Sequence, residues 1–331
     1  MAHLYRGKGF PRMPKLVGSL GDFGVRVFFV ISGYLITTLL LDERARSGTI
    51  SLRGFYVRRI YRIFPAFYAF LAVVVTLAAT GAITLQPGDI LHAATFTMNH
   101  HQARSWWVGH LWSLSVEEQF YLIWPTVFLV AGIERALGVA AAAVVLAPAA
   151  RVLTWHLMPS AREGIGESFP TICDSVALGC LLAGMGPWLG RQPRYLWFLR
   201  SPLAALLPLV ALGAHQLWIS PSVYLPVGHS AVDVALALYI DRVVRFPGTL
   251  DGRVLNVGAL EFVGKLSYSL YLWQQLFLNR TSTSPLCAFP LNLVLAALVA
   301  VVSYYGVERT FLRLRARRSM AGGQGSSHPP R

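Results

Sequence analysis

One apolar stretch of the sequence carries ionisable and hydroxyl side chains at helical spacing. Its polar members in HLWSLSVEEQFY (110–121) include His110, Ser113, Glu117 and Tyr121. Residues three or four apart share one face of a helix, so these side chains form a stripe. A carboxylate in an apolar helix is costly unless it lines a wet cavity or pairs with a cation, so the stripe predicts a functional site. The alternative is solvation at the headgroup level. Glu117 is preferred to Glu118 because its face also carries the histidine and the hydroxyls.

A second group of candidate residues is basic. Arg58, Arg59 and Arg62 lie close together in RRIYRIFP (58–65). Guanidinium groups bind polyphosphates through bidentate hydrogen bonds, so the cluster predicts a phosphate-binding site. The alternative is an anchor that contacts lipid headgroups on the cytoplasmic face.

Two further residues depend on their surroundings. Asp174 lies within an apolar block, where a carboxylate predicts a polar site. His3 has no meaning alone, but it would face the same cavity if a helix preceded Met1. A near-neutral imidazole there could take a proton from a hydroxyl.

Other polar residues favour structural interpretations. Ser32 and Gly33 are small, which is typical of close helix packing in membranes. His100 and His101 lack a third ligand at suitable spacing, so no metal site is expected. No permanently bound cofactor is expected either.

The elements that must position these residues are membrane helices. Of the 331 residues, 55% are apolar and 13% are charged, against roughly one quarter charged in soluble domains. The apolar residues come in blocks close to the ~20 residues that span a bilayer. The net charge of +14 lies in short clusters between these blocks, where membrane topology places it, so nucleic-acid binding is not expected.

The blocks predict an all-α bundle with nine spans. They are residues 23–41, 63–82, 108–131, 136–156, 169–186, 201–218, 221–240, 259–278 and 290–308. If the C-terminus is cytoplasmic, the inner segments hold 19 Lys and Arg and the outer segments seven, which supports that orientation.

This topology divides the chain into three parts. Residues 1–22 form an outer loop with the remnant of a first helix, 23–310 the transmembrane bundle, and 311–331 a basic, disordered cytoplasmic tail. In this topology the four cations of residues 1–22 lie outside the membrane, with no preceding helix to carry the segment across it. A helix before Met1 is therefore expected, which makes ten spans in the complete protein.

Six motifs in order resemble one known family. They are GVRVFFVISGYLIT (24–37), RRIYRIFP (58–65), HLWSLSVEEQFYLIWP (110–125), CDSVALGCLLA (173–183), LEFVGKLSYSLYLW (260–273) and VERTF (307–311). Together they look like the acyltransferase family 3 membrane proteins, from about residue 20 to 315. The resemblance implies ten helices in the inner (cytoplasmic) membrane. It also implies transfer of an acyl group, commonly acetyl, from cytosolic acyl-CoA to a hydroxyl of an extracytoplasmic carbohydrate or glycoconjugate.

The resemblance also implies roles for particular residues. The arginines of 58–62 would bind the CoA phosphates, His3 would deprotonate the acceptor or relay the acyl group, and Glu117 would orient or stabilise that histidine. Candidates for contacts with the substrate are His110, Ser113, Tyr121 and Asp174. The family's arginine upstream of the histidine has no counterpart in this chain, and Gln274 and Thr310 stand where many members have histidine and proline. Two alternatives remain: a transporter or flippase of a glycolipid or acyl carrier, and an inactive truncated member.

Overall fold

Long helices make up most of the structure. The computed structural model describes residues 20–216, 221–279, 282 and 284–323, and no strand occurs among them. The long helices are α2 (Leu20–Ser47), α3 (Leu52–Ala79), α6 (Leu111–Leu157), α7 (Phe169–Leu189), α12 (His229–Arg245), α14 (Gly258–Phe277), α15 (Leu291–Ser303) and α16 (Arg309–Gly323). The shorter elements are α4 (Asp89–Ala94), η2 (Met98–His100), α5 (Trp106–Gly109), η3 (Pro159–Gly164), α8 (Pro193–Arg200), α9 (Pro202–Ala205), α10 (Leu207–Gln216), α11 (Pro221–Val223), η4 (Tyr224–Gly228), α13 (Leu250–Leu255), η5 (Pro285–Cys287) and η6 (Tyr304–Glu308). Helices suit a bilayer because they satisfy their backbone hydrogen bonds internally.

Six stretches of helix are long and apolar enough to cross a membrane. Within the described residues they are Leu20–Ser47, Leu52–Ala79, Trp106–Leu157, Pro159–Leu189, Pro221–Arg245 and Leu291–Arg317. The all-α membrane class is therefore confirmed, whereas the expected nine spans are not. The segment 201–218 breaks into α9 and the short α10, and α14 carries the charged pair Glu261 and Lys265.

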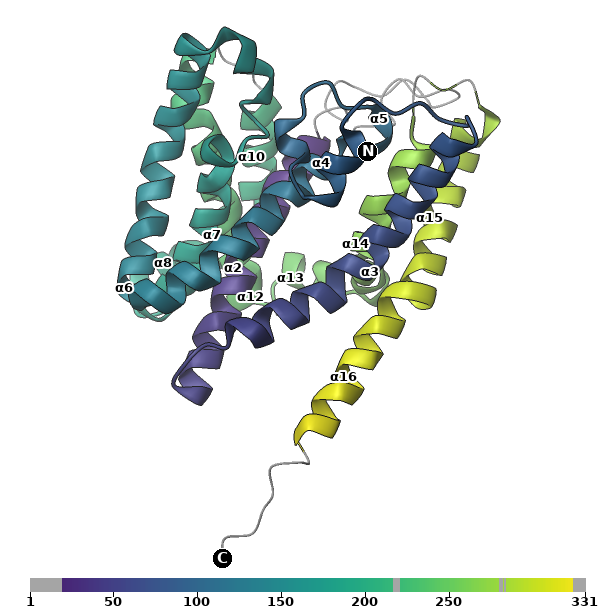
Figure 1. Ribbon diagram of the computed structural model, residues 1–331. Helices are drawn as coiled ribbons and strands as arrows, with labels where there is room; N and C mark the ends of the chain where they lie inside the picture. Colours follow the sequence, from purple (N-terminus) through teal and green to yellow (C-terminus); the bar gives the residue numbers. More distant parts are fainter. Residues whose placement is uncertain (1–19, 217–220, 280–281, 283, 324–331) are drawn as a thin grey trace, which may run out of the picture.

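Gly132 divides α6 into two halves. Its φ of 77° and ψ of 170° lie outside the helical region, in a conformation that only glycine adopts without strain. The chain reverses direction near this point, so the two halves of α6 run in opposite senses (Figure 1). This break agrees with the gap expected between the spans 108–131 and 136–156.

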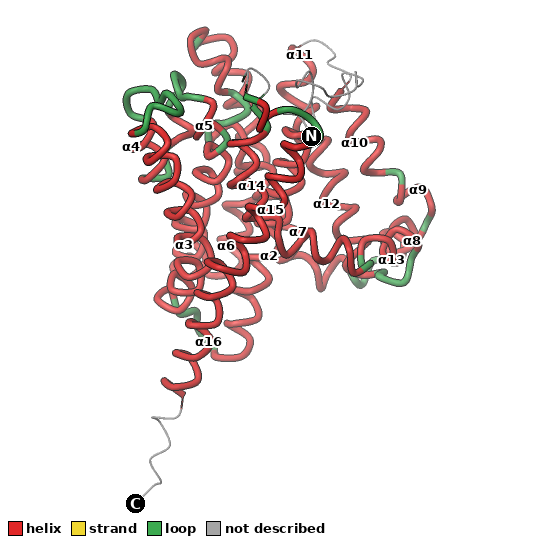
Figure 2. The backbone as a smooth tube through the Cα atoms, turned by 90° about the vertical axis from the view of Figure 1, so that its right-hand side faces the viewer, coloured by secondary structure: helices red, strands yellow, loops and turns green. Residues whose placement is uncertain are grey.

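The long helices form two groups. In one group α2, α7, α10 and α12 pack together with the second half of α6. In the other, α3 packs with α14, α16 and η6, and α15 packs on α14 (Figures 1 and 2). The first half of α6 touches both groups, since Trp124 donates to Thr37 of α2 and Tyr56 of α3 donates to the carbonyl of Leu122. A core of buried side chains from α2, α3, α6 and α14 joins them.

The contact between α2 and α7 is unusually close because glycines form it. A Cβ on Gly33 would lie 2.0 Å from the carbonyl oxygen of Val176, and one on Gly179 would lie 2.1 Å from that of Val30. Neither position has space for a side chain. The interpretation of Gly33 as a packing residue is therefore confirmed.

Two helix boundaries differ from those expected. The N-terminus of α3 is set by Ser51, whose hydroxyl accepts a hydrogen bond from the Gly54 amide at 3.0 Å, so the arginine cluster lies inside the helix and not ahead of it. At the other end of the chain, α16 continues to Gly323, although a disordered tail is expected from residue 311.

Candidate active site

The carboxylate of Glu117 lies at a buried junction between α2 and α6. It accepts hydrogen bonds from the Ser32 hydroxyl at 2.7 Å and from the Tyr121 hydroxyl, and the two hydroxyls are 3.4 Å apart. Only 5% of Glu117 is exposed. Ser32, predicted to be a packing residue, is thus a polar partner of Glu117. This contact could not be predicted from the sequence, because the two residues are 85 positions apart.

Arg59 brings a positive charge to this junction from α3. Its guanidinium carbon lies 4.8 Å from the centre of the Tyr121 ring and 5.5 Å from that of Phe55, which is cation–π geometry. The charges of Arg59 and Arg62 both act on the Glu117 carboxylate. The carboxylate therefore has two hydroxyl donors, and the ring of one of them, Tyr121, carries the Arg59 guanidinium.

The other arginines of the cluster face different partners. Arg58 forms an ion pair with Glu43 near the C-terminal end of α2, at 2.6 Å. Arg62 is exposed and acts electrostatically on Glu308, a buried carboxylate of η6 that accepts from Ser269. The three guanidinium groups therefore share one helix, but of the three it is Arg59 that packs on the Tyr121 ring. Ser32, Glu117, Tyr121 and Arg59 together are called the Glu117 cluster.

His110 and Ser113 form a second polar contact with α14. The Tyr271 hydroxyl donates to the carbonyl oxygen of His110 at 2.6 Å and lies 3.1 Å from the Ser113 hydroxyl. The His110 and Phe70 rings pack perpendicular to each other, with ring centres 5.7 Å apart. The stripe expected on α6 therefore divides into two parts. His110 and Ser113 face α14, whereas Glu117 and Tyr121 face α2 and α3. Tyr271 lies in a motif used for the resemblance, yet nothing in its spacing predicts this contact.

Asp174 forms part of a buried charged network. It accepts from Arg151 at 2.9 Å and from Ser230 at 2.6 Å, and neither charged side chain of the pair is exposed. Close by, Asp233 accepts from Arg26 at 2.9 Å and from Ser175 at 2.7 Å. Each cation therefore neutralises one acid, and the network ties α2, α7 and α12 to the second half of α6.

His3 lies outside the described residues. Among the residues that are described, no group of three or more His, Cys, Asp or Glu side chains could hold a metal ion. Around Glu117 the described residues supply a buried carboxylate with hydroxyl partners and a guanidinium close by.

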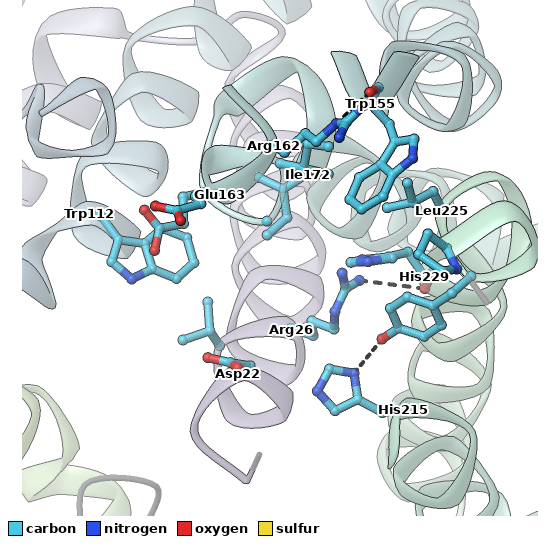
Figure 3. A pocket seen from close by; sticks show the side chains of 16 residues that line it. Asp22, Arg26, Trp112, Trp155, Arg162, Glu163, Ile172, His215, Leu225 and His229 are labelled. Carbon is cyan, nitrogen blue, oxygen red and sulfur yellow. Dashed lines mark hydrogen bonds between the residues drawn. The ribbon is translucent and has the colours of Figure 1, made fainter. Parts of the chain in front are cut away.

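A cavity of about 370 Å³ opens at the end of the bundle that carries α11 and the start of α2. Its walls come from α2, α6, η3, α7, α10, α11, η4 and α12, and Figure 3 shows Trp112 to the left of Arg26 and Trp155 above it. Arg26 and Ser32 are six residues apart on α2, which corresponds to about 9 Å along the axis. Phe29 lies between them, is fully buried and meets the Trp112 ring edge-on at 6.3 Å. The cavity and the Glu117 cluster are therefore close, with two aromatic rings at the boundary.

Comparison with known sequences identifies the family. A family model described as an acyltransferase domain, that of the acyltransferase 3 family, matches residues 1–307. The chain belongs to the acyltransferase 3 family. The resemblance in the six motifs is thereby confirmed.

Relatives of this acyltransferase 3 chain include proteins named as O-acetyltransferases. The O-acetyltransferase OatA of Staphylococcus aureus (strain NCTC 8325 / PS 47) is 29% identical over 328 aligned residues, covering 87% of this chain and 52% of the relative. The putative O-acetyltransferase SACOL0978 of Staphylococcus aureus (strain COL) is 27% identical over 323 residues, covering 88% and 52%. The chain thus spans about half the length of the curated relatives it matches. No solved structure matches.

Proposed function

We propose that this protein is a membrane O-acyltransferase that moves an acyl group, of which acetyl is the expected example, from cytosolic acyl-CoA to a hydroxyl of an extracytoplasmic carbohydrate or glycoconjugate. The observation that carries the proposal is the buried Glu117 carboxylate, which adjoins a cationic helix on one side and lies below an open cavity on the other. Membership of the acyltransferase 3 family and the names of the relatives support the reaction class.

The topology is part of the proposal. The proposed topology has nine crossings in this chain, with α6 counted as two, and a cytoplasmic C-terminus. The membrane is the inner membrane of the cell. The excess of Lys and Arg in the inner segments supports this orientation. The Arg59 end of α3 would then face the cytosolic donor, and the cavity would face the outside.

The reaction needs one proton acceptor and one acyl donor. The hydroxyl oxygen of the carbohydrate forms an ester bond with the acyl carbon while the carbon–sulfur bond of the thioester breaks, and CoA leaves as the thiol. His3 takes the hydroxyl proton as general base and gives it to the departing thiolate, and Glu117 orients the histidine or stabilises the imidazolium formed in between. Arg58, Arg59 and Arg62 would hold the CoA phosphates, and no metal ion or resident cofactor is required.

The first experiment measures transfer directly. Membranes that contain the full chain receive acetyl-CoA labelled in the acetyl group together with candidate glycoside acceptors, and labelled ester is quantified. His3→Ala is expected to lower transfer about 100-fold, the lower range for general base catalysis. Transfer at the wild-type rate in His3→Ala would contradict the role of His3. If no acceptor is labelled but a glycolipid crosses vesicle membranes, the transporter reading gains support.

The arginines are expected to differ in importance. Arg59→Ala should raise the KM for acetyl-CoA about 10- to 150-fold, because a charge-assisted hydrogen bond to phosphate contributes roughly 1.5–3 kcal/mol. Arg58→Ala should have a smaller effect, since Arg58 is held by Glu43. Initial rates at varied acetyl-CoA provide the measurement, with Arg53→Ala, at an exposed position in the first turn of α3, as the matched control. Equal effects of all three substitutions would contradict this assignment.

A further inference from the structure

A short amphipathic helix, α8, packs on the C-terminal end of α12. It follows α7 after residues 190–192, and its eight residues extend about 12 Å, which is too short to cross a bilayer. One side of α8 is fixed on α12, since the Tyr195 hydroxyl donates to Asp241 at 2.7 Å and Leu199, one turn further, is fully buried. Figure 2 shows α8 at the end of α12 that points away from α11. The helix therefore lies at a face of the membrane.

The other side of α8 carries arginines and an indole. Arg194, Trp197 and Arg200 fall within about 120° of one another on the helix, away from Tyr195 and Leu199. All three are exposed, Trp197 by 73%. A third exposed arginine precedes the helix by two residues. Arg191, Arg194, Trp197 and Arg200 together are called the α8 row.

The arginines of the α8 row keep their charge uncompensated. The acids close to α8 are already paired with arginines of α12: Asp241 with Arg245 at 2.6 Å, and Asp251 with Arg242 at 2.7 Å. Within the described part of the chain, no arginine of the row forms an ion pair. Three positive charges therefore surround one exposed indole on the outer side of the helix.

We propose that the α8 row binds the phosphate headgroups of anionic phospholipids, with the Trp197 indole between the headgroups and the acyl chains. Guanidinium groups bind phosphate bidentately, and indoles favour the interface between headgroups and chains, so the combination fits a lipid surface better than a soluble phosphate. Leu203 and Leu206, which follow the row, are exposed and offer an apolar surface to the chains. In the proposed topology this face is cytoplasmic, where anionic lipids give the leaflet its negative potential. Bound lipid would hold the ends of α7 and α12 at the membrane surface.

Lipid binding can be measured without an acyl donor or an acceptor. The purified full chain in a neutral detergent is titrated with dioctanoyl phosphatidylglycerol or dioctanoyl phosphatidylcholine, and native mass spectrometry gives the dissociation constant of the first bound lipid. Phosphatidylglycerol should bind at least about tenfold more tightly. Each of Arg191→Gln, Arg194→Gln and Arg200→Gln should weaken its binding about fivefold and leave phosphatidylcholine binding unchanged. Trp197→Ala should weaken both lipids to the same extent, because it removes apolar surface and no charge.

Two controls make the test specific to this surface. Arg46→Gln removes an exposed arginine at the end of α2 that already faces Asp42 at 3.8 Å, and it should leave the preference for phosphatidylglycerol unchanged. Excess glycerol 3-phosphate, which has no acyl chains, should not displace phosphatidylglycerol, and displacement would overturn the assignment to lipid. Equal affinity for the two lipids, or a preference that survives replacement of all three arginines, would overturn the site. Acyl transfer enters none of these measurements, so their outcome is independent of the proposed function.

Discussion

Replacing Glu117 by glutamine is expected to lower acyl transfer about 1,000-fold while the protein still folds. Glutamine preserves the volume of the side chain and can still accept from Ser32 and Tyr121, but it carries no charge. In catalytic triads, loss of the charge on the carboxylate that orients a histidine lowers turnover by up to about 10⁴-fold. Transfer from labelled acetyl-CoA measures the effect, and the elution profile of the detergent-solubilised protein checks folding.

The pH profile distinguishes an orienting role for Glu117 from a structural one. A carboxylate beside an imidazole raises its pKa, and transfer requires the neutral imidazole. The rate should therefore rise with pH, and the midpoint of that rise should move to lower pH in Glu117→Gln. Glu118→Gln is the matched comparison, because it removes a neighbouring carboxylate outside the Glu117 cluster, and it should keep most of the transfer. An unchanged midpoint together with a reduced rate would contradict the orienting role.

Replacing Arg151 by methionine is expected to destabilise the fold by about 3–5 kcal/mol, because it leaves the Asp174 carboxylate buried without its cation. Arg151 is fully buried and also donates to the carbonyl oxygens of Leu225 and Thr171 and to Ser230. The measurement is the temperature at which the solubilised protein loses its monodisperse peak.

A double substitution makes the second prediction specific. Arg151→Met combined with Asp174→Leu removes both charges and should recover part of the lost stability. Arg135→Met, at an exposed position near the break in α6, should have an effect within about 0.5 kcal/mol. If the double variant is less stable than Arg151→Met alone, the pair does not act as described, and a role of Asp174 in substrate contact gains weight.

Local patterns predicted the elements of the site, whereas contacts across the bundle needed the structure. Apolar blocks of bilayer length and the spacing of Glu117 and Tyr121 were readable because helical periodicity is local. The partner of Glu117 was not, since a small residue such as Ser32 in an apolar helix fits packing and hydrogen bonding equally well. Arg58 and Arg59 are adjacent and chemically identical, yet a distant acid, Glu43, separates their roles.

The cavity could not be predicted from the sequence for a related reason. Its lining comes from eight helical segments, and His229 and Trp155 have no spacing that connects them to Arg26. The break at Gly132 was anticipated only as a gap between apolar blocks, because a glycine alone does not specify a reversal of the chain. The count of nine spans stays a prediction, because α10 is short and α14 carries charges near its start, so neither is among the six candidate spans of the described residues.

The glycine contact between α2 and α7 limits how this bundle can move. Backbone meets backbone at Gly33 and Gly179, so neither helix can slide along the other by even one residue without a collision. The ion pairs of Arg26 and Arg151 fasten α12 and the second half of α6 to the same pair. These helices would act as a stationary frame during turnover. Two substrates that enter from opposite faces need an opening between them. That opening would then come from movement of α3, α14 and α16 and from rotation of the Phe29 and Trp112 rings.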